Sequence, residues 1–320
     1  MAGKEFYIGV DIGGTKIAAA LVDAAGKIHA RDKIPSGGKS GRQIVQEVSL
    51  LIKTLFRPQK LEGTRPVGVG IAVPGLVDTK SQRIVVTPNM DLSGTDLAGA
   101  VSRRMRCPVK TGNDVNLGVL GEQWRGAARR FRNVVGLFPG TGLGGGVIIQ
   151  GELLTGSHGA AAELGHMIVD PAGHRCTCGN KGCLEAYVGR WAIQRDIRKA
   201  VRKGKKTIIS KLTGGDLTVI KSKVLAKALG KKDKVAVSVM RKASRMLGVG
   251  CLNVRHIFDP EIIILGGGLM EACGDFILPI VRKAVRNDPF FAHLKPCAVE
   301  PAALQDDAVI LGAVRLCMQP

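Results

Sequence analysis

Four side chains that bind soft or borderline metals lie close together in the middle of the chain. They are His166, Cys176, Cys178 and Cys183, which fall within eighteen positions. Three thiolates and one imidazole form the ligand set of a closed tetrahedral zinc site, the structural kind that leaves no position open for water. A group of buried thiols is the alternative, but so many glycines around these residues suit a tight metal loop better than an apolar core. We therefore predict a structural zinc site.

Two glycine-rich segments, residues 11–16 and 140–146, have the composition of phosphate-binding turns. Glycine allows backbone N–H groups to approach a phosphate closely, and the carboxylate of Asp11 suits Mg²⁺ or its water shell. A plain glycine hairpin would look the same. However, each segment lies between two predicted strands, and this weak internal repeat predicts two related α/β lobes. We expect a cleft between the lobes, in which both turns grip a polyphosphate.

Other polar residues and glycines follow predicted strands and are further candidates. Asp114 stands between a strand and a helix, where an α/β fold can turn a carboxylate toward a ligand, or where it could simply cap the helix. Gly266–Gly268 precede a helix, which suits a nucleotide or an ordinary turn. Asn89 follows Pro88 and could reach a polar ligand or form a turn. Residue type alone leaves these alternatives open.

Apolar periodicity predicts the elements that must position these groups. Predicted strands cover residues 6–10, 17–22, 27–31, 67–73, 133–138, 147–150 and 261–265. Predicted helices cover residues 44–55, 95–105, 184–198, 235–254 and 307–318, with one more that ends near residue 125 and shorter ones within 207–240. Alternating strands and helices indicate an α/β protein.

Length and composition are those of a globular protein. The 320 residues, 45% of them hydrophobic, are enough for two ordinary domains with a sizeable core. No apolar run reaches the roughly 18 residues of a membrane span, and the first residues do not resemble a secretory signal. The cysteines outside the metal cluster are scattered, which indicates reduced thiols rather than a disulfide framework. We therefore expect a cytoplasmic protein without a membrane partner.

The formal net charge of +21 is the most unusual property of the composition. An anionic partner such as nucleic acid, a membrane surface or polyphosphate would explain it. The alternative is a solvated basic surface, which we favour because the basic runs lie on predicted helices and lack interleaved aromatic residues. Nucleic acid is therefore not expected as a partner, whereas polyphosphate stays open as a phosphoryl donor.

The order of these motifs resembles the ROK family of sugar kinases and sugar-responsive repressors. The resemblance rests on Glu163-Leu-Gly-His166, on the Cys-x-Cys-Gly-x-x-Gly-Cys-Leu-Glu pattern that ends at Glu185, and on the Gly-Asn-Asp-x-Asn element around Asp114. It implies a two-lobed sugar kinase/actin-like (ribonuclease H-like) fold with a zinc-binding loop. The implied small α/β lobe covers residues 1–113, with the helix at 307–320 packed back on it, and the large lobe covers residues 114–306.

The resemblance also implies roles for individual residues. Asp114 matches the catalytic base, and His166 would place one ring nitrogen on zinc and the other on a sugar hydroxyl, because a metal fixes the orientation of an imidazole. The implied sugar-binding residues are Asn89, Asn113, Glu163, His166 and Glu185. The implied residues for ATP, bound with Mg²⁺, are Asp11, Gly13, Gly14, Thr15, Lys16, Gly140, Thr141, Gly142, Gly144, Gly266, Gly267 and Gly268. A homodimer or homotetramer is the usual assembly of the family.

The implied function is that of an ATP-dependent hexokinase that converts glucose to glucose 6-phosphate. The segment after Asn89, residues 90–95, lacks the aromatic residue common in the glucokinase branch. Kinases for N-acetylglucosamine, N-acetylmannosamine, mannose or fructose are therefore alternatives. A sugar sensor or regulator is a further alternative, but the family's repressors carry an N-terminal DNA-binding domain. Because the first predicted strand begins at Phe6, we expect a kinase.

Overall fold

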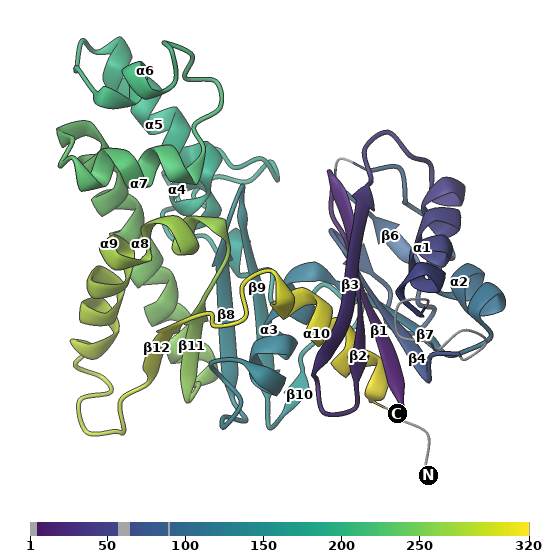
Figure 1. Cartoon of the computed structure of the whole chain (residues 1–320). Helices are drawn as coiled ribbons and strands as arrows, with labels where there is room; N and C mark the ends of the chain where they lie inside the picture. Colours follow the sequence, from purple (N-terminus) through teal and green to yellow (C-terminus); the bar gives the residue numbers. More distant parts are fainter. Residues whose placement is uncertain (1–4, 57–64, 89, 320) are drawn as a thin grey trace. The chain divides into compact units, whose positions relative to one another are not determined.

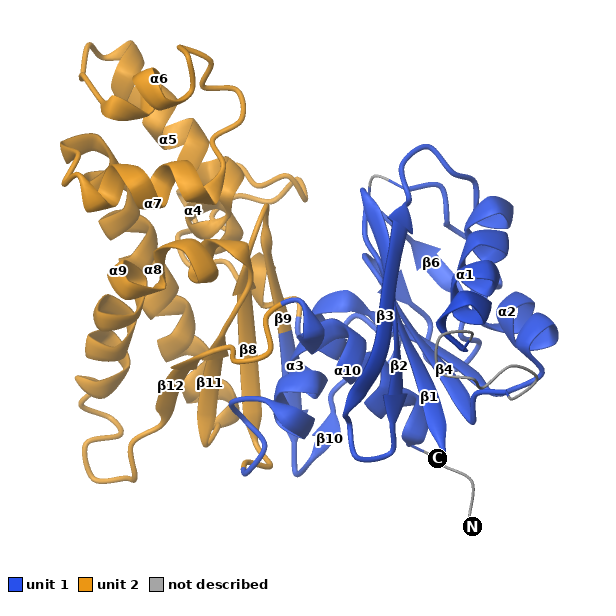
Figure 2. Cartoon of the chain, viewed as in Figure 1, with its two compact units in different colours: residues 1–130, 146–162, 306–320 blue, residues 131–145, 163–305 orange. Residues whose placement is uncertain are grey.

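The computed structural model describes residues 5–56, 65–88 and 90–319. The chain divides into two compact units (Figure 2). The first comprises residues 1–130, 146–162 and 306–320, and the second comprises residues 131–145 and 163–305. The boundary between the small and the large lobe, expected from the sequence between residues 113 and 114, stays a prediction.

The first unit is built on a five-stranded mixed sheet (Figure 1). In the order β3-β2-β1-β4-β7, its strands are Ile28–Pro35, Lys16–Asp23, Phe6–Ile12, Gly68–Val73 and Val109–Asn113. Strands β1, β2 and β3 pair antiparallel, whereas β4 is parallel to both β1 and β7. Parallel pairing places the ends of β1, β4 and β7, and the residues that follow them, at one edge of the sheet, where α/β proteins bind ligands.

Helices cover this sheet on both faces (Figure 1). They are α1 (Gly41–Phe56), α2 (Leu97–Met105), α3 (Asp114–Arg125) and α10 (Asp307–Met318). Helix α1 buries Ile44, Val48 and Leu51 at helical spacing and joins α2 in the apolar core of the sheet, while α10 packs against β1, β4 and α3. Every residue of β4 is buried, as expected for a strand covered on both faces. Two short strands, β5 (Leu76–Val77) and β6 (Ile84–Val86), form a separate ribbon.

Glycines let the backbone of α10 approach the sheet closely. A Cβ atom added to Gly70 in β4 would lie 1.8 Å from the carbonyl oxygen of Ala313. A Cβ added to Gly312 would lie 1.7 Å from the carbonyl oxygen of Leu117 in α3. The contacts are between backbone atoms that cannot rotate away, so α10 sits at this depth only because both positions lack a side chain.

We expect the unfolding free energy of the Gly70→Ala variant to be lower by about 1–3 kcal/mol or more, which is the typical cost of overpacking a core. The physical reason is that the new methyl group must displace the backbone of α10 at Ala313. Urea denaturation with a spectroscopic probe of the first unit would measure the change. Gly37→Ala is the control, since a Cβ at Gly37 meets nothing within 4 Å. Equal stability of the two variants would contradict the close approach.

The second five-stranded sheet has the order β10-β9-β8-β11-β12. Its strands, in the same order, are Glu152–Leu153, Leu143–Ile149, Val134–Pro139, Ile262–Leu265 and Ala298–Pro301. Strand β11 runs parallel to β8 and β12, and the chain passes from one unit to the other within β9. The ends of β8 and β11 therefore lie side by side, which places the segments after Pro139 and Leu265 next to each other.

The helices of the second unit lie between residues 185 and 286 (Figure 1). They are α4 (Glu185–Val188), α5 (Arg190–Arg202), α6 (Ile208–Leu212), α7 (Ser222–Gly230), α8 (Lys234–Phe258) and α9 (Gly268–Arg286). Helices α8 and α9 pack against each other, α7 packs on α9, and α4 and α5 pack on α8. Among the described residues, no helix is both long enough and apolar enough to span a membrane.

The single helix predicted over residues 184–198 is interrupted at Gly189. The backbone there is extended, with φ −58° and ψ 144°, and separates α4 from α5. The interruption turns the N–H groups of Arg190 and Trp191 toward the carbonyl oxygens of Gly140 and Thr141, at 3.1 and 3.3 Å. Hydrogen bonds to a distant turn thus replace those of a continuous helix.

Candidate functional site

The four predicted metal ligands come together in the second unit. Their ligand atoms all lie within 4.8 Å of one another. The sulfur atoms of Cys178 and Cys183 are 3.6 Å apart, and the sulfur of Cys176 is 3.8 Å from Nδ1 of His166. A tetrahedral metal with bonds of about 2.3 Å to sulfur separates its ligands by about 3.8 Å. The donor set therefore fits one tetrahedral ion, with Nδ1 of His166 as its nitrogen ligand.

Backbone hydrogen bonds hold the metal loop in this shape. The N–H of Cys176 donates to the carbonyl of Asn180 at 2.8 Å, and the N–H of Gly179 donates to the carbonyl of Cys176 at 3.1 Å. Gly179 and Gly182 both have positive φ, and a Cβ on Gly182 would lie 1.7 Å from the carbonyl oxygen of Asp170. The glycines are thus required by the turn, as the sequence predicted.

The thiols of the loop differ in acidity. Burial, together with the neighbouring thiols Cys178 and Cys176, raises the pKa of Cys183 to about 12. Burial also raises the pKa of Cys176. By contrast, the backbone N–H of Asn180 holds the pKa of the exposed Cys178 below its usual value. Three thiolates at this separation require a cation, so metal binding must release protons.

Glu185 connects the metal loop to the second glycine turn. It is buried at the start of α4, and its Oε2 accepts a hydrogen bond from the N–H of Leu143 at 2.9 Å. Its Oε1 accepts from the hydroxyl of Thr177 at 3.1 Å and from the indole N–H of Trp191 at 3.2 Å. A Cβ on Gly142 would lie 2.3 Å from Oε2. The carboxylate therefore connects both segments, and a side chain at position 142 would have to displace it.

Arg190 is a functional candidate that the sequence analysis did not identify. Its Nη2 donates to the hydroxyl of Thr141 at 2.8 Å, and its backbone N–H donates to the carbonyl of Gly140 at 3.1 Å. Its Nε is buried and has no hydrogen-bond partner in the structure. A guanidinium group thus stands beside the glycine turn. The signal in the sequence is the glycine before Arg190, which interrupts the helix.

His166 ends a short 3₁₀-helix, Leu164–His166, that packs against the start of β9, and Glu163 is the N-cap residue of this helix. A Cβ on Gly165 would lie 2.0 Å from the carbonyl oxygen of Leu143. His166 is partly buried, and Glu163 is exposed. The sulfur of Cys176 is 3.8 Å from both His166 and Glu185. The structure thus places the side chains of His166 and Glu185 at the metal loop, while Glu163 directly precedes the helix that carries His166.

The third glycine segment lies beside the second one. Gly267 has φ +80° and is the N-cap of α9, and its added Cβ would lie 2.9 Å from the carbonyl oxygen of Pro139. A Cβ on Gly268, the first residue of the helix, would meet nothing within 4 Å. Free N–H groups at the start of a helix attract anions. The segments 140–142 and 266–268 thus form one glycine-rich surface of the second unit.

In the first unit, Asn113 and Asp114 lie at the junction of β7 and α3. Asn113, not Asp114, caps the helix: its side-chain oxygen accepts from the N–H groups of Val115 and Asn116 at 2.9 and 3.0 Å. Its Nδ2 donates to the carbonyl of Gly75 at 2.9 Å. Asp114 is the first residue of α3 and is partly buried. Oδ1 of Asp114 also accepts from the N–H of Val115 at 2.9 Å, so its carboxylate is held at the first turn of α3.

Asp11 is the last residue but one of β1 in the same unit and lies near Asp114. Burial raises the pKa of Asp11 to about 6, and the charge of Asp114 raises it as well, while Lys16 opposes the shift. Two carboxylates that repel each other beside a glycine turn form a natural site for a hard cation such as Mg²⁺. The turn itself is closed by a hydrogen bond from the N–H of Gly13 to the carbonyl of Lys16 at 2.9 Å.

We expect the Asp11→Asn variant, without metal or nucleotide, to be more stable than the unchanged protein at pH 8. The pKa of Asp11 is about 4 in the unfolded chain and about 6 in the native one. The protonated carboxyl therefore stabilises the native state fully below pH 4, and this stabilisation is lost as the pH rises through about 6. The pKa shift corresponds to a gain in unfolding free energy of at most about 3 kcal/mol for the variant at pH 8. We expect roughly 1–3 kcal/mol, because the side chain is only partly buried. Thermal unfolding from pH 4 to 8 would measure it. A variant that is less stable at pH 8 would contradict the repulsion.

One predicted site residue, Asn89, lies outside the described residues. The others are placed as follows. The first unit holds Asp11, Gly13, Gly14, Thr15, Lys16, Asn113 and Asp114, and the second holds Gly140, Thr141, Gly142, Gly144, Glu163, His166, Cys176, Cys178, Cys183, Glu185, Gly266, Gly267 and Gly268.

Comparison with known proteins identifies the family. The sequence model of the ROK family matches residues 7–319, and the chain belongs to this family. It is 34% identical to a glucokinase of Thermotoga maritima over 97% of this chain and 96% of that protein. It is 29% identical to a xylose repressor of Caldicellulosiruptor bescii over 97% of this chain and 77% of the repressor.

The fold is shared with solved structures of the same family. The crystal structure of a ROK family glucokinase from Streptomyces griseus in complex with glucose and AMPPNP has a TM-score of 0.81 and 33% identity, covering 98% of this chain and all of that one. The predicted family and the predicted two-lobed sugar-kinase fold class are thereby confirmed. The predicted roles of individual residues stay predictions.

Proposed function

We propose that the protein is an ATP-dependent hexokinase that phosphorylates glucose to glucose 6-phosphate. The observation that carries the proposal is the full-length similarity to glucokinases, one of them solved with glucose and an ATP analogue. The local geometry supports it, since a carboxylate pair lies in the first unit, and glycine turns and a metal loop lie in the second.

The proposed base is Asp114. It accepts the proton of the reacting hydroxyl while that oxygen attacks the terminal phosphate in line, for which the two oxygens must come within roughly 2.6–3.2 Å. Asn113 holds the start of α3 in place through its cap, so the direction of Asp114 is fixed by the backbone. We assign Asn89, Asn113, Glu163, His166 and Glu185 to the hydroxyl groups of the sugar.

The proposed donor site comprises the glycine turns and Asp11. Backbone N–H groups of these turns stabilise the charge that develops on the transferred phosphoryl group, which is the main task of the protein in such reactions. Asp11 has the ligand chemistry to hold Mg²⁺ or its water shell, and the ion would neutralise phosphate charge when bound. We add Arg190 to this site because its guanidinium lies at Thr141.

The proposed metal in the loop is Zn²⁺, held by His166, Cys176, Cys178 and Cys183, whose separations fit a tetrahedral ion. With Nδ1 of His166 on the metal, its Nε2–H is left to donate to a sugar hydroxyl. The metal would thus fix the orientation of His166, and Glu185 would extend this order to Leu143.

Specific observations favour some variants of this proposal. The similarity to xylose repressors keeps a sugar-responsive regulator as the second candidate. Kinases for N-acetylglucosamine, N-acetylmannosamine, mannose or fructose are the alternatives for the sugar substrate.

Polyphosphate as a phosphoryl donor is supported by an open groove of about 930 Å³ in the second unit. Its lining includes Lys232, Lys234, Arg241, Lys242 and Arg245. We further propose a homodimer or homotetramer in the cytoplasm.

The test is phosphoryl transfer by the purified protein with a panel of hexoses and N-acetylhexosamines, each with ATP or polyphosphate. We expect the highest kcat/KM with glucose and ATP. Turnover of another sugar would correct the substrate, and turnover with polyphosphate alone would correct the donor. If the protein bound sugar but showed no turnover, with its metal content verified, the result would favour a sugar-responsive regulator over a kinase.

A further inference from the structure

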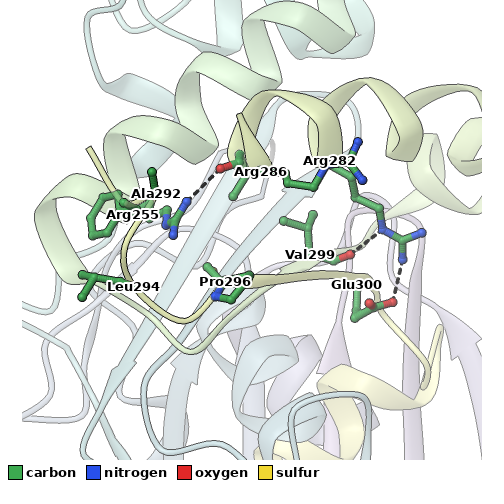
Figure 3. A pocket seen from close by; sticks show the side chains of 11 residues that line it. Arg255, Arg282, Arg286, Ala292, Leu294, Pro296, Val299 and Glu300 are labelled. Atoms are coloured by element: carbon green, nitrogen blue, oxygen red, sulfur yellow. Dashed lines mark hydrogen bonds and ion pairs between the residues drawn. The ribbon is translucent and has the colours of Figure 1, made fainter. Parts of the chain in front are cut away.

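A pocket of about 290 Å³ lies in the second unit, away from the glycine turns (Figure 3). It is formed by the last turns of α8 and α9 and by residues 291–300, a segment that includes most of β12. Helix α9 starts at Gly268 and ends at Arg286, so about 28 Å of helix separates its two ends. The pocket is therefore distinct from the proposed donor site.

Three arginines line this pocket: Arg255, Arg282 and Arg286. Arg255 is only 3% exposed. Its Nη1 donates to the carbonyl of Val285 at 2.8 Å, and its Cζ lies 4.1 Å from the centroid of the Phe291 ring. Its Nε is buried and has no hydrogen-bond partner in the structure. A buried charge that is bonded so incompletely is costly unless an anion completes its coordination.

The other two arginines stand one turn apart on α9. Arg282 is fixed, because its Nε donates to the carbonyl of Val299 at 2.8 Å and its Nη2 contacts Glu300 at 2.7 Å (Figure 3). Arg286 is exposed, and within the described part of the chain it has no hydrogen bond or ion pair. One cation of the pocket is thus anchored, and a second is left for a ligand.

Acidic groups do not balance this charge. Glu300 is the carboxylate in the lining, and it is bonded to Arg282. Asp288 lies near Arg255, but its oxygens accept from His256 and from the N–H of Phe290. The hydrogen bond from His256 and the charge of Arg255 hold the pKa of Asp288 below its usual value. The pocket therefore keeps an excess of positive charge.

We propose that this pocket binds a small organic phosphate. A guanidinium group matches phosphate oxygens with two parallel hydrogen bonds, and a partly buried one does so in the absence of competing water. The remaining wall is apolar, with Phe291, Leu294 and Pro296, and suits a short carbon body. The volume is at the lower limit for ligand pockets, which fits a phosphate ester of a small metabolite.

The test is calorimetric titration of glycerol 3-phosphate and glucose 6-phosphate into protein already saturated with glucose, Mg²⁺ and AMPPNP. These ligands occupy the proposed active site, so the titration reports on a second site. We expect Arg286→Ala to weaken binding about tenfold or more, the value of one lost charge-assisted hydrogen bond. Arg286→Lys, which keeps the charge but not the fork, should lie between.

Lys283→Ala is the matched control, because Lys283 is exposed on the same helix but does not line the pocket. Its affinity should stay within about twofold of the unchanged protein. No saturable binding at millimolar ester, or equal losses in Arg286→Ala and Lys283→Ala, would overturn the proposal. If inorganic phosphate bound as tightly as the esters, the apolar wall would not contribute to binding, and the proposal of an organic phosphate would be wrong. The comparison of variants holds whether or not the protein is a kinase.

Discussion

Replacing Asp114 by asparagine should lower kcat by about 10²–10⁴-fold, the usual contribution of a positioned general base. The amide cannot take the proton of the hydroxyl, but it keeps the size of the side chain and the start of α3, since Asn113 provides the cap. The Kd for glucose should therefore change by no more than a few-fold. Steady-state kinetics and calorimetry on the same preparation would separate the two effects.

Asp32→Asn is the control for this experiment, because Asp32 is an exposed carboxylate on β3 of the same unit. It should retain full turnover. If Asp114→Asn kept near-normal turnover, another group would have to be the base. If it lost glucose binding together with turnover, Asp114 would hold the sugar rather than activate it.

Removal of the metal should disorder the proposed sugar site. We expect the metal content to be about one ion per chain in the unchanged protein and well below half an ion per chain in Cys183→Ser, because a closed site needs all four ligands. Loss of the ion frees His166 and the loop around Cys176, so glucose affinity should drop about tenfold or more, since disturbed metal surroundings typically cost about 10–100-fold. Metal analysis and calorimetry would measure both quantities.

Cys317→Ala is the matched control, since Cys317 is a free cysteine on α10 of the first unit. It should keep both metal and glucose affinity. Unchanged affinity for glucose after verified removal of the metal would show that the loop keeps its shape alone. The network around Glu185, with Leu143 and Thr177, would then be sufficient to hold it.

Local signals in the sequence predicted much of this molecule. The apolar stripe of α1 and the bounds of α10 are observed as predicted, because each pattern extends over three or more turns. The metal loop was predicted for a different reason: ligand types and glycines at short spacing constrain one another strongly. Such signals require no knowledge of distant contacts.

The features that the sequence did not predict depend on distant contacts. The interruption at Gly189 is stabilised by hydrogen bonds to residues 140–141, almost fifty positions earlier. The same contacts bring Arg190 to the glycine turn, and a single glycine within a helical pattern does not by itself predict such an interruption. Strands β11 and β12 each have four residues, but β11 is buried throughout whereas in β12 only Val299 is buried, so β12 lacks the apolar run that identifies a strand.

Helix α10 also affects the order in which the chain can fold during synthesis. All residues of the second unit precede residue 306, whereas the first unit needs residues 307–318 to cover β1 and β4. Domains fold as their segments leave the ribosome, so the second unit can be finished while the first still exposes an apolar face of its sheet. The unit that begins first is therefore completed last, and chaperones or proteases would meet it during that interval.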